Sequence, residues 1–582
     1  MKTLATIHSI KQAAKTTQDT VMTVYRSLDQ LRGVGTMDEV LAKVILLASL
    51  HQSGKISADQ PSILRQVQAL NDAALDAIFE RDTILVHTDE QMVKEVIMQL
   101  SAISFDTQTL SFLLTLCLSD RRSGHAVYQD SVMRLFNALM DVKKGQSVYV
   151  SSPASLPLLP YLAQTSNVTY ESMQLGVIDR IALYLLSDQV LWRMSDLVAE
   201  PVVPKKQVDY AVSIPPFGVR FMHNGGETGI DGKGFITRSY DVAMAWQMLH
   251  LAKEQACVSI AAGHLSSTIE RGFRKHLIDN GFLRAVIYMP QGAVLNSGAT
   301  TALLIIDPKG GHDRVRLVEL EKTDFVTKHG RDIQILDMGS LVEHIWDDAE
   351  HAGMVSVANE RLAKDDYVLS QAKYVLSPTG KALGELLENR QTLPLNKLVN
   401  FQRGLPNASK EGNATIYEIG ANDITETVLH SVCRTREVDH QVVDDNYDNF
   451  VQPNDIVLIH KGGVGKICFI GDNAPKAGED GWVAGLAALT LRPKKDALIS
   501  PKALYMYLQS QAGQEALSQI VVGSALGTIP LKELRQLPVI IPSKDELAQI
   551  ERAFDQICDQ EQVLRELTQE IWTARQQFWA LI

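Results

Sequence analysis

Hydrophobic and polar positions follow a helical period over the first part of the chain. Apolar residues recur at helical spacing in three segments, at residues 7–31, 40–50 and 92–118. Glycine- and serine-containing turn signals separate the segments, and few β-branched runs compete with them. The pattern predicts a helical domain over residues 1–125.

From about residue 126 short apolar runs alternate with amphipathic segments. Strands are predicted at residues 147–150, 209–213, 257–262, 283–289, 301–307 and 315–320, with a further strand ending near residue 170. Helices are predicted at residues 132–142, 243–253, 269–280 and 339–352. This alternation is typical of a parallel sheet with helices on both faces. We therefore predict an α/β domain over residues 126–385, and ligands of such sheets bind at the carboxyl ends of the strands.

The last third changes to short strand-like runs, glycine-rich turns and one long terminal helix. A second α/β domain is predicted over residues 386–543. In the terminal helix an apolar residue recurs at every seventh position, at Ile550, Ile557, Leu564, Ile571 and Phe578. A sustained seven-residue period indicates a coiled-coil seam rather than a face packed on a globular core, so residues 544–582 are predicted to form a coiled-coil helix. A second copy of the chain or a partner subunit would occupy the seam, and an intrachain helix pair is the alternative.

Composition narrows the class of protein. The chain is 45% hydrophobic and 21% charged, as is ordinary for globular proteins. Its five cysteines form no C-x-x-C pair, which argues against a zinc site or a disulfide framework and favours a reducing cytoplasm. No metal site is expected. No signal peptide and no apolar run long enough to span a bilayer is found, which argues against a membrane protein.

The charge of the chain gives no support for broad DNA binding. The net charge is −12, and residues 392–582 carry 18 Lys and Arg against 24 Asp and Glu. A DNA-coating protein is usually basic. Any DNA-binding face must therefore be local.

The stretch DYAVSIPPFG at residues 209–218 predicts a buried strand followed by a rigid turn. Pro215 and Pro216 fix φ and cannot donate to a sheet, so the strand must end there, and Phe217 follows at a fixed angle. The stretch resembles the Asp/Asn/Ser-Pro-Pro-Tyr/Phe motif of amino-methylating DNA methyltransferases. The resemblance implies that the first residue of the motif and a proline carbonyl bind the target amine. It also implies that the aromatic ring of the motif stacks on a flipped base. Here Ile214 stands where the polar residue belongs.

The order of the neighbouring segments resembles the methylase (M) subunits of type I restriction-modification systems. The similar segments include GQSVYV, AWQMLHLAKEQACVSIAAGHL and FRKHLIDNGFLRAVIYMPQGAVLNSGATTALLIIDPKG. The resemblance implies a Rossmann-like methyltransferase sheet behind a helical domain. It also implies an S-adenosylmethionine loop after the first strand, with an acidic residue, a proline and a Gly-x-Gly turn.

The expected cofactor loop is degenerate. The segment reads VSSPASLP, and no glycine occurs between Gln146 and Gly176. The remaining candidates for cofactor binding are Ser151, Pro153, Ser155 and Glu171, the last in the place of the family's ribose-binding acid. Leu156 and Pro157 are expected to enter the space of the methionine and ribose, and a lone strand-end glutamate is more often solvated.

Loss of both the cofactor cradle and the amine acceptor predicts a pseudo-methyltransferase that uses no cofactor. Methyl transfer needs donor and amine held in near-attack geometry, and neither holder is present in the sequence. Three alternatives stay open: an active S-adenosylmethionine-dependent N6-adenine methyltransferase, a register in which Ser213 or Ser151 replaces the acceptor, and a protein-interaction scaffold without DNA binding.

Residues 395–542 resemble a target recognition domain of a type I specificity subunit. Similar features are the turn at 422–424, the G-x-x-G hairpin at 462–465 and the run at 523–542. The predicted contacts to double-stranded DNA are Arg403, Lys461, Gly462, Gly463 and Lys466, because basic residues beside a glycine-rich turn fit phosphate. The resemblance places the chain in a restriction-modification or phage-defence complex, beside a nuclease or motor subunit.

Overall fold

The computed structural model describes residues 37–79, 90–119, 126–186, 189–195, 207–220, 237–330, 332–347, 349–406, 412–521 and 527–577. The chain divides into two compact units, Met1–Gln371 and Ala372–Ile582. The boundary precedes the predicted one at residue 385, and the finer division into four parts stays a prediction. The predicted helix at 7–31 and most of the glycine-rich segment 221–239 lie outside the described residues. No described helix has the length and apolar character needed to cross a bilayer.

The first unit begins with the predicted helices. They are α2 (Met37–Gln52), α3 (Ile63–Ala69), α4 (Ala73–Phe79), α6 (Glu90–Ser101) and α7 (Thr107–Cys117). The single apolar segment predicted at 92–118 is two helices, because Asp106 caps α7 by accepting a hydrogen bond from the Thr109 N–H at 2.8 Å. Polar capping at Asp106 thus interrupts a continuous helical period.

A nine-stranded sheet forms the body of the first unit, in the order β11-β8-β6-β7-β5-β4-β1-β2-β3. The strands are β1 (Ser147–Ser151), β2 (Asn167–Ser172), β3 (Val190–Met194), β4 (Val208–Ser213), β5 (Ala252–Ala261), β6 (Leu283–Tyr288), β7 (Thr301–Ile306), β8 (Arg314–Glu319) and β11 (Met354–Ala358). The predicted α/β class is confirmed, but the sheet is mixed rather than wholly parallel, because β7 and β11 run antiparallel to their neighbours.

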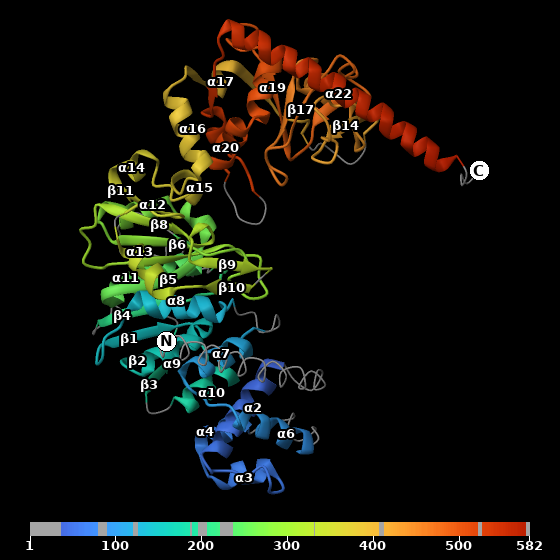
Figure 1. Ribbon diagram of the computed structural model, residues 1–582. Helices are drawn as coiled ribbons and strands as arrows, with labels where there is room; N and C mark the ends of the chain where they lie inside the picture. Colours follow the sequence, from blue (N-terminus) through green and yellow to red (C-terminus); the bar gives the residue numbers. More distant parts are fainter. Residues whose placement is uncertain are drawn as a thin grey trace, which may run out of the picture. The chain divides into compact units, whose positions relative to one another are not determined.

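Helices cover the sheet and join it to the N-terminal helices. They are α8 (Asp130–Met140), the 3-10 helix η2 (Pro153–Leu158), α9 (Leu159–Ala163), α10 (Val177–Leu185), α11 (Tyr240–Leu251), the 3-10 helices η3 (Ala262–Leu265) and η4 (Leu320–Lys322), α12 (Arg271–Asp279), α13 (Met338–Trp346), α14 (Asn359–Lys364) and α15 (Gln371–Tyr374), of which the last lies at the unit boundary. Helix α11 packs on β4 and β5, and α8 also contacts β5. One hydrophobic core runs from α2 through α7 and η2 into the sheet, so the N-terminal helices and the sheet fold as one unit (Figure 1).

The predicted helix at 339–352 ends early. Helix α13 stops at Trp346, and the chain then turns into β11 at one edge of the sheet. A two-stranded ribbon of β9 (Val326–His329) and β10 (Asp332–Ile335) precedes α13.

The second unit contains three small sheets, ordered β13-β19-β16-β17, β15-β14-β18 and β12-β20. Its strands are β12 (Thr392–Pro394), β13 (Val399–Gln402), β14 (Ala414–Ile419), β15 (Thr435–Val438), β16 (Ile456–Ile459), β17 (Ile467–Phe469), β18 (Trp482–Ala484), β19 (Ala488–Pro493) and β20 (Pro538–Ile540). Its helices are α16 (Pro378–Glu388), α17 (Leu395–Leu398), α18 (His440–Asp445), the 3-10 helix η5 (Tyr447–Asn449), α19 (Pro501–Gln509), α20 (Gln511–Gln519), α21 (Leu531–Arg535) and α22 (Lys544–Gln576). The predicted α/β class with a long terminal helix is confirmed.

Helix α22 packs on its own unit over its first half. Phe554 is buried, with its ring centroid 4.9 Å from that of Phe469 and 5.7 Å from that of Tyr505. Ile550, a member of the seven-residue series, packs partly against the same core. The expectation that this stripe faces only a coiled-coil partner is therefore wrong for the first half of the helix. Phe578 lies outside the described residues.

Candidate functional site

A cavity of about 340 Å³ lies where β1, β2 and β4 reach their carboxyl ends. This volume is near the lower end of those of small-molecule sites. Its walls include Ser151, Ser152, Pro153, Ala154, Ser172, Asp179, Ser195, Pro216, Tyr240 and Met244. Parallel neighbours β1, β2 and β4 bring Ser151, Glu171 and Ser213 to one level of the sheet. The cavity thus lies where α/β sheets bind ligands.

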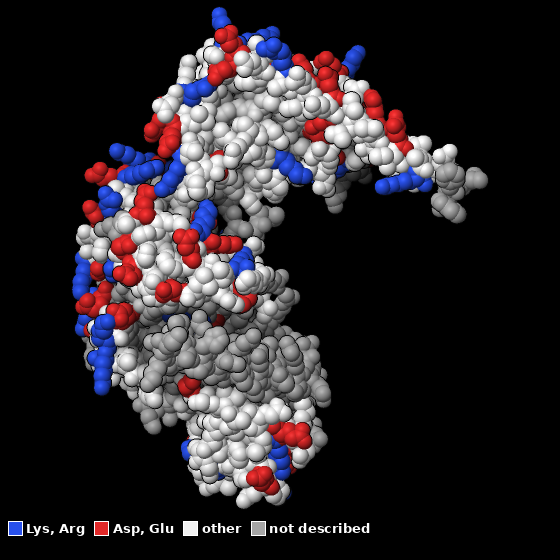
Figure 2. Space-filling model, in the orientation of Figure 1, with Lys and Arg blue, Asp and Glu red and all other residues white. Residues whose placement is uncertain are grey.

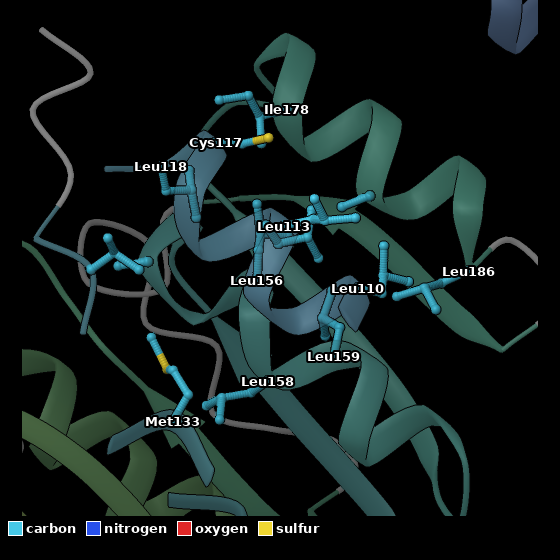
Figure 3. Packing of buried hydrophobic residues seen from close by; sticks show 14 of the residues in the cluster. Leu110, Leu113, Cys117, Leu118, Met133, Leu156, Leu158, Leu159, Ile178 and Leu186 are labelled. Carbon is cyan, nitrogen blue, oxygen red and sulfur yellow. The ribbon is translucent and has the colours of Figure 1, made fainter. Parts of the chain in front are cut away.

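The turn after β1 leaves this cavity open. Leu156 is fully buried and packs with Leu110 and Leu113 of α7 (Figure 3), and neither Leu156 nor Pro157 belongs to the cavity wall. The expectation that these two side chains fill the cofactor space is therefore wrong. The wall is built instead from Ser152, Pro153 and Ala154, and Pro153 has no N–H to offer a ligand.

Ser152 holds a backbone conformation that favours glycine. Its φ is 82° and its ψ is 139°, which costs an L residue about 1–3 kcal/mol. Its Oγ donates to the Ile214 carbonyl at 2.7 Å, and its N–H donates to the Glu171 carbonyl at 3.2 Å. The loop has therefore kept a positive φ without keeping a glycine.

Ile214 turns away from the cavity. Its side chain is fully buried in the main core and is absent from the cavity wall. Its N–H donates to Ser155 Oγ at 2.9 Å, and Ser155 Oγ donates to the Ser151 carbonyl at 2.7 Å. The expected hydrocarbon side chain facing a base is thus wrong in detail: serine hydroxyls hold both backbone groups of Ile214, and its side chain belongs to the core.

Only part of the Pro-Pro-Phe stretch is exposed to the cavity. Pro215 is buried, whereas Pro216 lines the cavity. Phe217 is half-buried, with its ring edge-on to Tyr128 at a centroid distance of 6.4 Å. Ser213, the proposed substitute acceptor, is fully buried with its Oγ 3.4 Å from the Ser151 carbonyl. Of the two substitute candidates, only Ser151 reaches the cavity.

The carboxylate of Glu171 is paired with Arg193, its neighbour on β3. The carboxylate is almost completely buried, with one oxygen on Arg193 Nε and the other on Ser195 Oγ. Arg193 also lies over the Tyr149 ring, 5.8 Å from its centroid. Burial raises the pKa of Tyr149, and the Glu171 carboxylate raises it further. Glu171 is thus neither a solvated residue nor an acid free to receive ribose hydroxyls.

Three residues at this site, Arg193, Ser195 and Asp179, were not predicted from the sequence. The first two belong to β3 and its end, a short strand that was not predicted although its apolar run VLWRM was a signal. Asp179 lines the cavity, and it accepts hydrogen bonds from the Tyr170 hydroxyl at 2.6 Å and the Gly176 N–H at 3.1 Å. Burial raises the pKa of the Asp179 carboxyl. The Gly-x-x-Asp spacing before a helix was the available signal.

The backbone strain at Ser152 predicts that a glycine variant at this position is more stable than an alanine variant. Ser152→Gly and Ser152→Ala both remove the bond to the Ile214 carbonyl, but only glycine relieves the positive φ. We expect Ser152→Gly to be more stable than Ser152→Ala by about 1 kcal/mol in urea unfolding. At Ser155, which has no positive φ, the alanine variant should be the more stable of the pair. An alanine variant that is the more stable at both positions would contradict the strain at Ser152.

A second candidate site lies on the hairpin between β16 and β17. Gly462 and Gly465 have φ values of 67° and 89°, so the tight turn requires glycine-type conformations there. Gly463 lies between them and is exposed. Lys461 is also exposed, and Lys466 Nζ donates to the Ala421 carbonyl at 3.1 Å.

The positive charges of Arg403 and Lys461 both act on His460. Burial lowers the pKa of His460, and the positive charges of Lys461 and Arg403 lower it further. Among the described residues, neither basic side chain has an acidic partner. On the face shown in Figure 2 the Lys and Arg side chains of the second unit are interspersed with Asp and Glu. The part of the second unit that the structure describes therefore shows no broad basic face on this side (Figure 2).

Two family models match the chain. Residues 178–382 match N-6 DNA methylase, and residues 403–572 match the type I restriction modification DNA specificity domain. A search of curated proteins finds no match.

Solved structures also resemble the chain. A type I restriction-modification methyltransferase subunit from Streptococcus thermophilus is 14% identical, with a TM-score of 0.50, and covers 62% of this chain and 100% of its own. The type IIG restriction endonuclease BpuSI is 10% identical, with a TM-score of 0.45, and covers 93% of this chain and 75% of its own. At such identity the first match shows a shared fold.

Proposed function

Because this chain joins an N-6 DNA methylase domain to a type I restriction-modification DNA specificity domain, we propose that it is a DNA-recognition subunit whose own methyl-transfer site is silent. Its complex would be of the restriction-modification or phage-defence type. The proposed lack of methyl-transfer activity depends on the conformation of the turns after β1 and β4.

The buried Ile214 carries the proposal. A methylase needs a polar group beside the target amine, and here that position is a core side chain. The Ile214 N–H donates to Ser155 Oγ and its carbonyl accepts from Ser152 Oγ, so the turn after β1 holds this residue with its side chain in the core. Without the polar side chain, the amine would depend on a proline carbonyl alone, and methyl donor and amine would not be held in near-attack geometry.

The residues around the cavity also fit S-adenosylmethionine poorly. Pro153 supplies no N–H at the start of η2, and Glu171 is already neutralised by Arg193. A ribose would have to displace Arg193 from the buried Glu171 carboxylate, which is costly because that buried charge would lose its ionic partner. We therefore derive no catalytic step through this cofactor.

One observation favours the runner-up, an active S-adenosylmethionine-dependent N6-adenine methyltransferase. The cavity at the strand ends persists, with Ser151, Asp179 and Tyr240 in its wall. A third candidate, a scaffold without DNA binding, rests on the acidic net charge. The partners proposed are double-stranded DNA at the hairpin cluster, a second copy or partner subunit along α22, and a nuclease or motor subunit. Free cysteines support a cytoplasmic location.

Titration calorimetry of the full chain with S-adenosylmethionine tests the silent site. We expect no binding heat up to millimolar ligand for the wild type, because Glu171 and the turn offer no partners. The Arg193→Leu variant is the matched probe, since it frees the Glu171 carboxylate without changing the turn. Micromolar binding by the wild type would overturn the proposal in favour of the active enzyme.

A further inference from the structure

Three metal-binding side chains converge beside the end of α13. His344, Asp347 and His351 each offer a ligand atom, and these atoms all lie within 4.8 Å of one another. None of the three lines the cavity described above. Among the residues that the structure describes, no other group of three His, Cys or acidic side chains is so close.

The early end of α13 creates this cluster. The Asp347 N–H makes the last helical bond, to the Glu343 carbonyl at 3.1 Å, and the extended ψ of 160° at Asp347 then ends the helix. The backbone of His351 pairs with Met354 in the turn that leads into β11. The two imidazole rings therefore meet with centroids 4.2 Å apart.

Hydrogen bonds fix which nitrogen of His344 can bind a metal. His344 Nδ1 lies 2.7 Å from the Ser340 carbonyl. A carbonyl oxygen only accepts, so Nδ1 carries the proton and Nε2 keeps its lone pair. This outer hydrogen bond is the arrangement that orients metal-binding histidines.

Asp347 lies between His351 and a buried arginine. His351 Nε2 is 2.7 Å and 3.0 Å from the two carboxylate oxygens of Asp347. Arg316 Nη2 is 3.4 Å from Asp347 Oδ1 and donates to the His344 carbonyl at 2.7 Å. Arg316 thus positions the backbone of one ligand and the carboxylate of another, and it leaves Oδ2 for an ion.

We propose that His344, Asp347 and His351 bind one divalent transition-metal ion of the zinc class, with water in the fourth position. Two imidazole nitrogens and one carboxylate oxygen suit zinc, cobalt or nickel, whereas magnesium and calcium prefer oxygen alone. Bonds of about 2.1 Å place tetrahedral ligand atoms about 3.4 Å apart, so small side-chain rotations close the site. The ion takes the place of the proton on His351 Nε2: an imidazolium releases that proton to solvent, whereas a neutral ring exchanges it onto Nδ1 and stays neutral.

The bound ion ties the end of α13 to the turn before β11. Strand β11 is an edge of the nine-stranded sheet, held by β8 on one side only. The side chains of His351 and Asp347 are 27% and 39% exposed, so an ion reaches them from solvent. The site is therefore a structural clip that binds metal reversibly at the sheet edge.

Metal titration of the chelator-stripped full chain tests the site. A Cys433→Ser background removes the exposed thiol as a competing ligand. We expect one Zn²⁺ per chain by calorimetry, and Co²⁺ should give the visible bands of a tetrahedral site without thiolate charge transfer. His351→Gln should weaken binding by about 100-fold or more. His312→Gln is the matched control, because His312 pairs with Asp307 at 2.9 Å without a third ligand.

Three results would overturn the site. They are the absence of stoichiometric Zn²⁺ binding in the Cys433→Ser chain, an equal loss of affinity in His312→Gln, and thiolate charge-transfer bands with Co²⁺. Circular dichroism separates a folding defect from a lost ligand: His351→Gln should keep the wild-type spectrum and lose only the rise in melting temperature that Zn²⁺ gives the wild type.

Discussion

Replacing Arg403, Lys461 and Lys466 together by alanine will lower the affinity for double-stranded DNA by about 100-fold at 0.1 M salt. Each side chain is exposed beside the glycine-rich hairpin, and Arg403 and Lys461 lie close enough to influence the same histidine. Each lost phosphate contact should also reduce the slope of log affinity against log salt by about one. Fluorescence anisotropy over a salt series measures both effects.

A charge-matched control separates local contacts from net charge. Lys397, Lys476 and Lys495 are exposed in the same unit and lie outside the hairpin. Replacing these three by alanine changes the net charge equally, so a smaller loss is expected. Unchanged affinity of the first variant at low salt would remove the hairpin cluster from the DNA interface. An equal loss in both variants would assign binding to the general charge of the unit.

Replacing Leu564, Leu567 and Ile571 by serine is expected to dissociate the assembly that we propose along α22. These side chains are 62%, 49% and 53% exposed, although all three are apolar and lie on one stripe of the helix. Each is already about half covered, so complete burial stabilises association by about 1 kcal/mol per side chain, and a homodimer would bury all three on both chains. We therefore expect a dissociation constant raised by about 10⁴-fold. Sedimentation equilibrium of the purified chain gives the oligomeric state of both proteins.

Trp572→Ser is the control for this change. Trp572 is as exposed as Ile571 but lies off the seven-residue stripe, so its loss should leave the assembly intact. Equal dissociation by Trp572→Ser would contradict a seam along the stripe. A wild-type chain that is monomeric at every concentration would exclude the homodimer and assign the stripe to a partner subunit.

The two halves of α22 show what a seven-residue period in the sequence can and cannot predict. The seven-residue series is continuous in sequence, yet Phe554 and Ile550 pack on the second unit, whereas Leu564 and Ile571 face solvent. A period states which side chains share a face of the helix. It does not state what lies opposite that face, because the globular unit covers only part of the helix length.

At the methylase-like site, too, some features follow from the local sequence and others only from the folded structure. The missing glycines and the hydrocarbon at position 214 are local facts, and they predicted a degenerate site before any fold was known. The direction of Leu156 and Ile214 into the core was decided by packing against elements distant in sequence, such as α7. The pair of Glu171 with Arg193 depended on parallel registration of β2 with β3, which no local pattern specifies.

Sequence by itself determined the two α/β regions and the helical start of the chain, and it predicted a degenerate methyl-transfer site, because periodicity and residue type are local properties. Only the tertiary structure decided that a cavity survives at the strand ends, that Glu171 is neutralised, and that Arg403 and Lys461 act on the same histidine. It also brought two histidines and an aspartate together where α13 ends. Each of these depends on which side chains meet after folding, and that is set by strand pairing and helix ends rather than by their spacing along the chain.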